Sequence, residues 1–201
     1  MWYMFMAGMK VLGICGSHRK ESTTQFFLQK ALEICKKEGF QTELVTLFDK
    51  KIGECNVCEL CKTKYDCSIK DDMQTIYKKM ESADAIIIAS PTYYAMVSGR
   101  IKNLFDRSLP LRRQGMKLRN KVGGAIAVGA SRDGGQELVC QQILSWMSFQ
   151  EMLPVTDRGT AHFGGTCWVP RGSRPEDDRI GIESCENLGR RIAEVLRLIK
   201  K

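Results

Sequence analysis

Short apolar runs alternate with helix-like segments along the whole chain, and this alternation restricts the fold more than any other feature. The clearest run, 85–89 (AIIIA), is apolar at every position, as expected for a parallel strand buried on both faces. The other predicted strands span 11–14, 42–47, 121–128 and 152–158. The predicted helices span 22–38, 71–82, 98–108, 135–149 and 176–199. Five strand–helix repeats predict an α/β fold with a doubly wound parallel sheet and helices on both of its faces.

The length of the chain is that of one domain. Its 201 residues, 43% of them hydrophobic, are enough to bury a full core without disulfides. We therefore expect a single domain over 1–201, with an insertion at 49–70 and a C-terminal loop and helix at 159–201. Residues 1–8 are apolar but too few to span a membrane, and we expect them to pack on the surface or on a partner; Met9 is an alternative start.

Charge and targeting signals narrow the class of protein. There is no secretion signal and no run of 18 apolar residues, so we expect a cytoplasmic protein without a membrane span. In such a reducing compartment, clustered thiols bind metal or act in catalysis more often than they form disulfides. The net charge of +8 is spread along the chain without a zinc-finger or RNA-recognition motif. This disfavours nucleic-acid binding and fits a basic face that attracts an acidic protein partner.

The loop after the first strand has the composition of an anion site. Residues 16–24 (GSHRKESTT) place hydroxyl groups and backbone N–H groups at the start of a helix, where a phosphate can bind. The loop contains neither a Walker A motif nor a GxGxxG motif, and it fits a terminal phosphate monoester better than a pyrophosphate. The candidate residues are Ser17, Arg19, Ser22, Thr23 and Thr24. In the alternative interpretation, Ser22 or Thr23 only caps the helix.

The loops after the third and fourth strands indicate a site for a flat ring. In the first of them a proline and two aromatic residues make a stiff platform, formed by Pro91, Thr92, Tyr93 and Tyr94. In the second, small residues let the backbone approach a ligand closely. The candidates there are Ala130, Ser131, Arg132, Gly134 and Gly135. In the alternative interpretations, the first of these loops only holds two partly buried tyrosines, and the second only connects a strand to a helix. Ligands of doubly wound sheets bind at this carboxyl edge, and three such loops at successive strand ends favour a binding site.

Four cysteines lie within thirteen residues of the insertion, in the pattern C-x2-C-x2-C-x5-C: Cys55, Cys58, Cys61 and Cys67. This spacing is typical of loops that bind iron–sulfur clusters. Unlike in bacterial ferredoxins, Ser68 rather than proline follows the fourth cysteine, and there is no second set, so all four are predicted to bind one cubane. Structural zinc and a disulfide or thioredoxin-like pair remain alternatives. The other cysteines are predicted to be buried in the core: Cys15, Cys35, Cys140, Cys167 and Cys185.

The three loops together resemble those of the flavodoxin-like FMN reductases, the NADPH-dependent FMN reductase superfamily, over about residues 9–150. With the cysteine insertion added, the chain resembles the iron–sulfur flavoprotein family of anaerobic archaea and bacteria. The resemblance implies a flavodoxin-like five-stranded sheet of order 2-1-3-4-5 with the cysteine-rich insertion after the second strand. It implies FMN, with the phosphate on the first loop and the ring against the other two. It also implies a 4Fe–4S cluster on the four cysteines, and homodimers or tetramers built from dimers.

The function that this resemblance implies is electron transfer between a ferredoxin-like donor and an acceptor, without a catalytic acid–base pair from the protein. Two alternatives stay open: an NAD(P)H-dependent FMN or quinone reductase, and a flavodoxin-like binding module with structural zinc. We also expect transfer between cluster and FMN to cross a subunit interface, with Trp2, Tyr3 and Phe5 among the contact residues.

Overall fold

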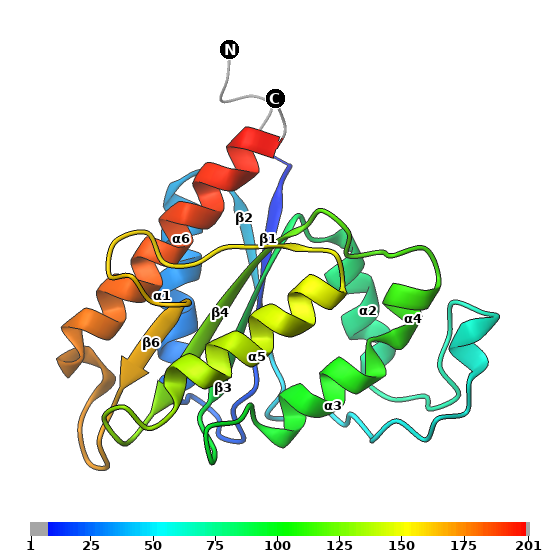
Figure 1. Cartoon of the computed structure of the whole chain (residues 1–201), viewed down its shortest axis with the longest axis horizontal. Coiled ribbons are helices and arrows are strands. Elements are labelled where there is room, and N and C mark those ends of the chain that lie inside the picture. Colours follow the sequence, from blue (N-terminus) through cyan, green and yellow to red (C-terminus); the bar gives the residue numbers. More distant parts are fainter. Residues whose placement is uncertain (1–7, 200–201) are drawn as a thin grey trace.

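A parallel sheet with helices on both faces makes up the molecule in the computed structural model, which describes residues 8–199 (Figure 1). The strands are β1 (Lys10–Cys15), β2 (Gln41–Thr46), β3 (Ala85–Pro91), β4 (Val122–Gly129), β5 (Leu153–Pro154) and β6 (Gly165–Trp168). Their order is β2-β1-β3-β4-β5, and every pair is parallel. The predicted order and the doubly wound architecture are therefore confirmed. The expected contacts of Trp2, Tyr3 and Phe5 fall outside the described residues.

The edge of the sheet beside β4 differs from the prediction of one strand over 152–158. There, β5 pairs only with the start of β4, and β6, inside a segment predicted as loop, pairs with residues 126–129 of β4. The hydrogen bonds to β4 and the residue before it come from the N–H groups of Leu153 and Val155, and Pro154 between them, which has no N–H group, suits this edge position. The Asp157 side chain then accepts hydrogen bonds from the N–H groups of Gly159 and Thr160, at 2.6 and 2.9 Å, and turns the chain away. The edge position is thus divided between two short strands.

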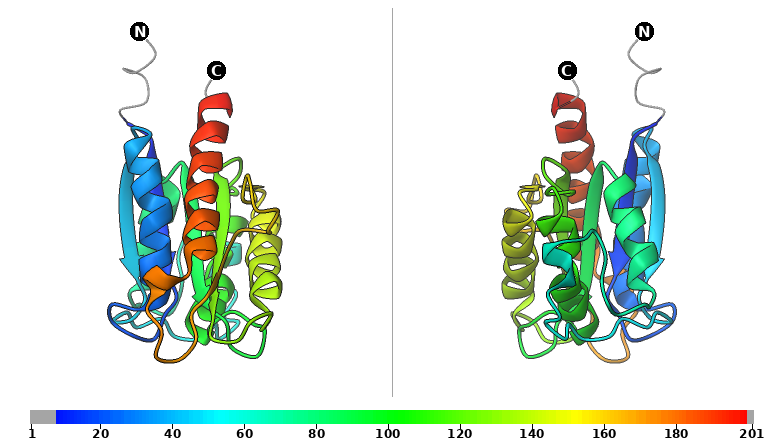
Figure 2. Two further views of the ribbon diagram at one scale, coloured as in Figure 1. Left: turned by 90° about the vertical axis from the view of Figure 1, so that its left-hand side faces the viewer. Right: turned by 90° about the vertical axis from the view of Figure 1, so that its right-hand side faces the viewer.

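The helices cover both faces of the sheet (Figure 1, Figure 2). They are α1 (Thr23–Lys37), α2 (Met73–Ser82), α3 (Gly99–Arg107), α4 (Leu109–Arg113), α5 (Gln136–Phe149) and α6 (Arg179–Ile199), with two short 3-10 helices, η1 (Leu60–Lys62) and η2 (Pro175–Asp177). The sequence did not predict α4, which follows α3 directly and has Pro110 in its first turn, a position that suits proline. None of the helices in the described part of the chain has the length and apolar character needed to cross a bilayer.

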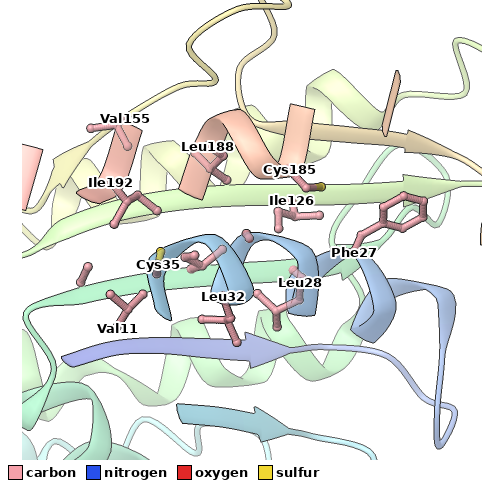
Figure 3. Close-up of a cluster of buried hydrophobic side chains, with 14 of the residues drawn as sticks. Val11, Phe27, Leu28, Leu32, Cys35, Ile126, Val155, Cys185, Leu188 and Ile192 are labelled. Carbon is pink, nitrogen blue, oxygen red and sulfur yellow. The ribbon is translucent and has the colours of Figure 1, made fainter. Parts of the chain in front are cut away.

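Two apolar layers, one on each face of the sheet, form the core. In the layer of Figure 3, Leu28 and Leu32 of α1 pack over β1, and Leu188 and Ile192 of α6 pack over β4. The other layer packs side chains of α2, α3 and α5 against the opposite face. Alternate residues of β1 and β3 enter the two layers, which explains their continuous apolar sequences. All five cysteines outside the insertion are buried, as predicted.

Candidate functional site

The three loops predicted to bind a phosphate and a flat ring meet at the carboxyl edge of β1, β3 and β4, which are neighbours in the sheet. The first loop is tied to the second: Gly16 donates to the Ala89 carbonyl at 2.8 Å, and its own carbonyl accepts from Ser98 Oγ at 2.8 Å. The second loop touches the third, because a Cβ at Gly135 would lie 2.4 Å from the Cβ of Ala95. The fold thus brings all three loops together.

In the first loop, hydroxyl groups surround the start of α1. Ser22 is the N-cap residue, and its Oγ accepts a hydrogen bond from the Gln25 N–H group. The capping interpretation is therefore correct for Ser22, although its hydroxyl can still donate to a ligand. Thr23 and Thr24 begin the helix, where backbone N–H groups have no intrahelical partner. Ser17 is buried, and its Oγ accepts from the Arg19 N–H group at 3.1 Å, whereas the Arg19 side chain is exposed. This arrangement suits an anion.

The second loop is a tight turn held by two hydrogen bonds between Tyr93 and Met96, of 3.1 and 2.9 Å. Between them, Tyr94 and Ala95 have φ angles of +51° and +59°, in the left-handed region that side chains rarely adopt. Such backbone conformations concentrate at functional sites. The Tyr94 side chain is 99% exposed and that of Tyr93 46%, so Tyr94 is not an ordinary partly buried tyrosine.

Thr92, at the start of this turn, carries an unsatisfied polar group. Its N–H group donates to the Val128 carbonyl at 2.8 Å, but its buried Oγ1 has no hydrogen-bond partner within residues 8–199. A buried hydroxyl left in this state costs about 1–3 kcal/mol, which a ligand with a polar edge would recover. The Thr92 hydroxyl therefore fits the polar edge of a flavin ring.

The third loop packs against a tryptophan that is not among the residues predicted from the sequence. Trp168, the last residue of β6, donates from Nε1 to the Ala130 carbonyl at 3.2 Å, and the Arg132 guanidinium lies 4.5 Å from its ring centre. Its sequence signal was the short β-favouring run 166–169 (TCWV). Arg132 and Gly135 also line a cavity of about 890 Å³ that extends toward the start of α6. That cavity lies beside the third loop rather than among all three loops.

The four clustered cysteines lie in the insertion between β2 and α2, which projects beside α3 and α4 (Figure 1). All four line one pocket of about 80 Å³, together with residues of α3 and α4. Cys67 is buried and Cys58 is exposed. Within residues 8–199 there is no group of three or more Cys, His, Asp or Glu side chains arranged to hold a single metal ion. The structure therefore shows four thiols around one pocket and no formed site for a single ion.

Arg107, the last residue of α3, closes the neck of the insertion. Its fully buried guanidinium forms a bidentate pair with Asp71, at 2.8 and 3.0 Å, and also donates to the carbonyls of Gly53 and Ile69. Burial alone would raise the pKa of Asp71. The hydrogen bonds from Arg107 and from the N–H groups of Gly53 and Met73 outweigh burial, so this pKa is lowered. The two ends of the insertion are thus held together at one ion pair.

Arg107 also lines the cysteine pocket, and within residues 8–199 its buried Nε has no hydrogen-bond partner. A buried donor without a protein partner is free to bond to water or to an anionic group. Four thiolates give a cluster negative charge, and the spare N–H donor of Arg107 complements it. The donor set and its surroundings therefore fit an iron–sulfur cluster.

Helix α3 connects the first loop to the insertion. Arg100 donates from Nη1 to the carbonyls of Leu47 and Lys50, at 2.5 and 3.0 Å, and from Nε to His18 Nδ1 in the first loop at 3.2 Å. Burial and the charge of Arg100 lower the pKa of His18. One turn later, Asn103 donates to the Ile52 carbonyl. These side chains are not among the residues predicted from the sequence; their signal was polar residues at a spacing of three and four along the predicted helix 98–108.

The buried cysteines differ chemically from those of the insertion. Burial raises the pKa of Cys15 and Cys140, and it raises that of Cys35 to about 12. These groups stay protonated thiols at neutral pH, whereas metal ligation requires the thiolate. Their role is packing.

Comparison with known proteins places this geometry among flavoproteins. Residues 9–164 match the NADPH-dependent FMN reductase family. The chain is 48% identical to an iron–sulfur flavoprotein of Methanocaldococcus jannaschii, over 96% of this chain and 100% of the relative. It is 41% identical to an iron–sulfur flavoprotein of Methanosarcina thermophila, over 96% of this chain and 98% of that relative. The solved structure of a flavodoxin, WrbA-like protein from Agrobacterium tumefaciens has a TM-score of 0.67 at 18% identity, over 94% of this chain and 98% of that one, which shows a shared fold.

Proposed function

Because the chain belongs to the NADPH-dependent FMN reductase family, and within it to the iron–sulfur flavoproteins, we propose that it transfers electrons between a ferredoxin-like donor and an acceptor, with FMN and a 4Fe–4S cluster as its cofactors. Family membership gives the chain its flavin-linked redox role. When bound, the cluster exchanges single electrons and the flavin exchanges one or two, so together they connect one-electron and two-electron partners.

The FMN phosphate would bind at the start of α1, to the residues already singled out there: Ser17, Arg19, Ser22, Thr23 and Thr24. The ring would lie against the second and third loops, with Thr92 and its unsatisfied hydroxyl at the polar edge. The other residues proposed to contact it are Pro91, Tyr93, Tyr94, Ala130, Ser131, Arg132, Gly134 and Gly135. The protein contributes position and hydrogen bonds, and no acid–base pair is required.

Comparison of FMN with riboflavin tests this assignment. Riboflavin lacks the phosphate and should bind much more weakly, because it loses the charge-assisted contacts of the first loop. The double variant Ser17→Ala with Arg19→Ala should narrow the difference between the two dissociation constants, measured by flavin fluorescence. Lys20→Ala, an exposed neighbouring position, is the matched control and should preserve the difference. Equal affinity of the native protein for the two ligands would refute the phosphate site.

The cluster would bind to Cys55, Cys58, Cys61 and Cys67. The observation that carries this proposal is that all four thiols line one pocket whose wall includes Arg107 with its spare buried Nε–H donor. Anaerobically purified protein should hold about four irons per chain. Cys58→Ala should lose the iron and keep FMN, because the loops proposed to bind FMN follow β1, β3 and β4, whereas the cysteines lie in the insertion after β2. Cys35→Ala, in the core layer on α1, should keep both. One zinc per chain, with no iron after anaerobic reconstitution, would favour the binding-module alternative.

An NAD(P)H-dependent FMN or quinone reductase is the second candidate, because the family that residues 9–164 match is described as NADPH-dependent. Anaerobic mixing with NADPH, without ferredoxin, separates the two functions. Fast bleaching of the flavin would favour the reductase. Bleaching that requires a reduced ferredoxin supports the electron-transfer proposal, and the net charge of +8 suits such an acidic donor.

A further inference from the structure

Two consecutive residues at the end of α4 contact one cysteine of the insertion. Arg113 donates from Nη1 to Cys61 Sγ at 3.2 Å, and Gln114 donates from Nε2 to the Cys61 carbonyl at 2.8 Å. Helix α4 is itself anchored, because Pro110 and Leu111 are buried against the core. The Arg113 guanidinium is thus held beside this sulfur by a fixed helix and a second hydrogen bond.

We propose that Arg113 is a positioning residue for the cysteine site, which stabilises negative charge on the Cys61 sulfur and thereby raises the reduction potential of a cluster bound there. This inference rests on the proposed function, since it concerns the same four cysteines. A cationic hydrogen bond to a ligand sulfur is one of the means by which proteins set the potential of such a cluster.

The other charged side chains near the pocket are paired with one another, so Arg113 is the residue suited to stabilise negative charge on the Cys61 sulfur. Arg107 is paired with Asp71, and the carboxylate of Asp106, also on the pocket wall, is paired with Lys102. The other two carboxylates on the wall, Glu59 and Asp66, are paired with Lys62 and Lys70. Beside the hydrogen bond from Lys62, the charge of Arg113 helps to lower the pKa of Glu59, but within residues 8–199 Arg113 forms no ion pair of its own with a carboxylate, and its guanidinium donates to the Cys61 sulfur.

The sign of the effect follows from charge balance. Reduction adds one electron to the site and removes one from the donor, with no bond made or broken. The reduced state is therefore more negative by one charge, and a guanidinium hydrogen-bonded to a ligand sulfur stabilises it more than the oxidised state. Loss of Arg113 should then make the site harder to reduce.

The neighbouring arginine provides a matched control. Arg112 lies on the same helix but donates to the Phe149 carbonyl and contacts Met116, away from the cysteines. Arg112→Gln and Arg113→Gln remove the same charge at adjacent positions, and only the second removes the hydrogen bond to sulfur.

The experiment is a mediated redox titration with dithionite on anaerobically reconstituted protein, with iron content and EPR spectrum measured alongside. Arg113→Gln should keep its iron and shift the potential to a more negative value. Arg113→Lys should shift it less, and Arg112→Gln should leave it unchanged. Native potential in Arg113→Gln, or equal shifts in both glutamine variants, overturns the proposal.

Two other outcomes are also decisive. Native protein that takes up no iron contradicts the cluster assignment, and this inference with it, whereas an iron-loaded native protein with an unshifted variant contradicts the inference alone. If Arg113→Gln loses its iron, the rates of iron loss to a chelator are compared. Slower loss from Arg113→Lys than from Arg113→Gln supports the role of the cation, and equal rates overturn it.

Discussion

Arg107 joins two segments that the sequence separates by 18 residues, Gly53 and Asp71, and it is completely buried while doing so. Removing one partner of a buried ion pair leaves a charge without compensation in a poorly solvated place. At the scale of single residues, the shape of the cysteine insertion therefore depends on the carboxylate of Asp71.

Asp71→Asn should lower the free energy of unfolding by about 3–5 kcal/mol, because the Arg107 guanidinium loses its counter-charge. Urea denaturation measures the change in the free energy of unfolding, and limited proteolysis shows whether the insertion opens before the rest of the protein. Asp49→Asn, which breaks an exposed pair with Lys50, is the control and should leave stability unchanged. Equal stability of the two variants would contradict a structural role for the neck pair.

The ion pairs of Glu43 on β2 should make the stability of the protein depend on pH. It pairs with Lys10 of β1 and Lys79 of α2. Burial opposes ionisation, but the two lysines outweigh it and lower the pKa of Glu43. A carboxyl whose pKa falls on folding contributes stability above its unfolded value, about 4.3, and that contribution is lost as pH falls through the folded value. The stability difference between native protein and Glu43→Gln should thus shrink below about pH 4. If the stability difference between the two proteins did not change with pH, a contribution from the ionised Glu43 carboxylate would be contradicted.

At the scale of elements, the packing of α1 on α6 requires a small residue. A Cβ at Gly189 would lie 2.6 Å from the backbone oxygen of Ala31, so the two helix backbones approach closely there. An alanine elsewhere in a helix would stabilise it relative to glycine by up to about 1 kcal/mol. Whether a change from glycine to alanine here raises or lowers the free energy of unfolding therefore shows how closely the two helices are packed.

Gly189→Ala should destabilise the protein by about 1–3 kcal/mol, the usual cost of inserting a group into a packed interface. Thermal and urea denaturation measure it. Gly99→Ala, at the start of α3, where a Cβ meets nothing within 4 Å, should be neutral or stabilising. A stabilised Gly189→Ala variant would show that the helices separate at little cost.

At the scale of the whole molecule, α3 and α4 lie between the loops proposed to bind FMN and the cysteine pocket. We expect the assembled protein to be a homodimer or a tetramer built from dimers, in which the insertion of one subunit approaches the proposed FMN loops of its partner. The nearly fully exposed Tyr94 and the 76%-exposed Val57 are apolar groups suited to such contact.

Mixed oligomers test this arrangement. Cys58→Ala should lack the cluster, and the double variant Ser17→Ala with Arg19→Ala should bind FMN weakly. When subunits exchange, the mixture should recover ferredoxin-driven flavin reduction that neither parent shows. Cys58→Ala mixed with Cys61→Ala is the control and should recover none. Verified exchange without recovery, or a stable monomer with the full rate, would contradict transfer between subunits.

The sequence alone predicted the strand–helix alternation and the loops of the two candidate cofactor sites, because these depend on local patterns, whereas the strand order followed from the family resemblance. Buried parallel strands such as 85–89 are apolar throughout, and ligand loops follow strand ends. The tertiary structure decided the rest. The β5–β6 edge, the docking of α4 on η1, the neck pair of Arg107 and the unsatisfied Thr92 hydroxyl all depend on residues distant in sequence. No local pattern distinguishes Arg113, which contacts a cysteine, from Arg112 beside it; only the direction that the folded helix gives each side chain does.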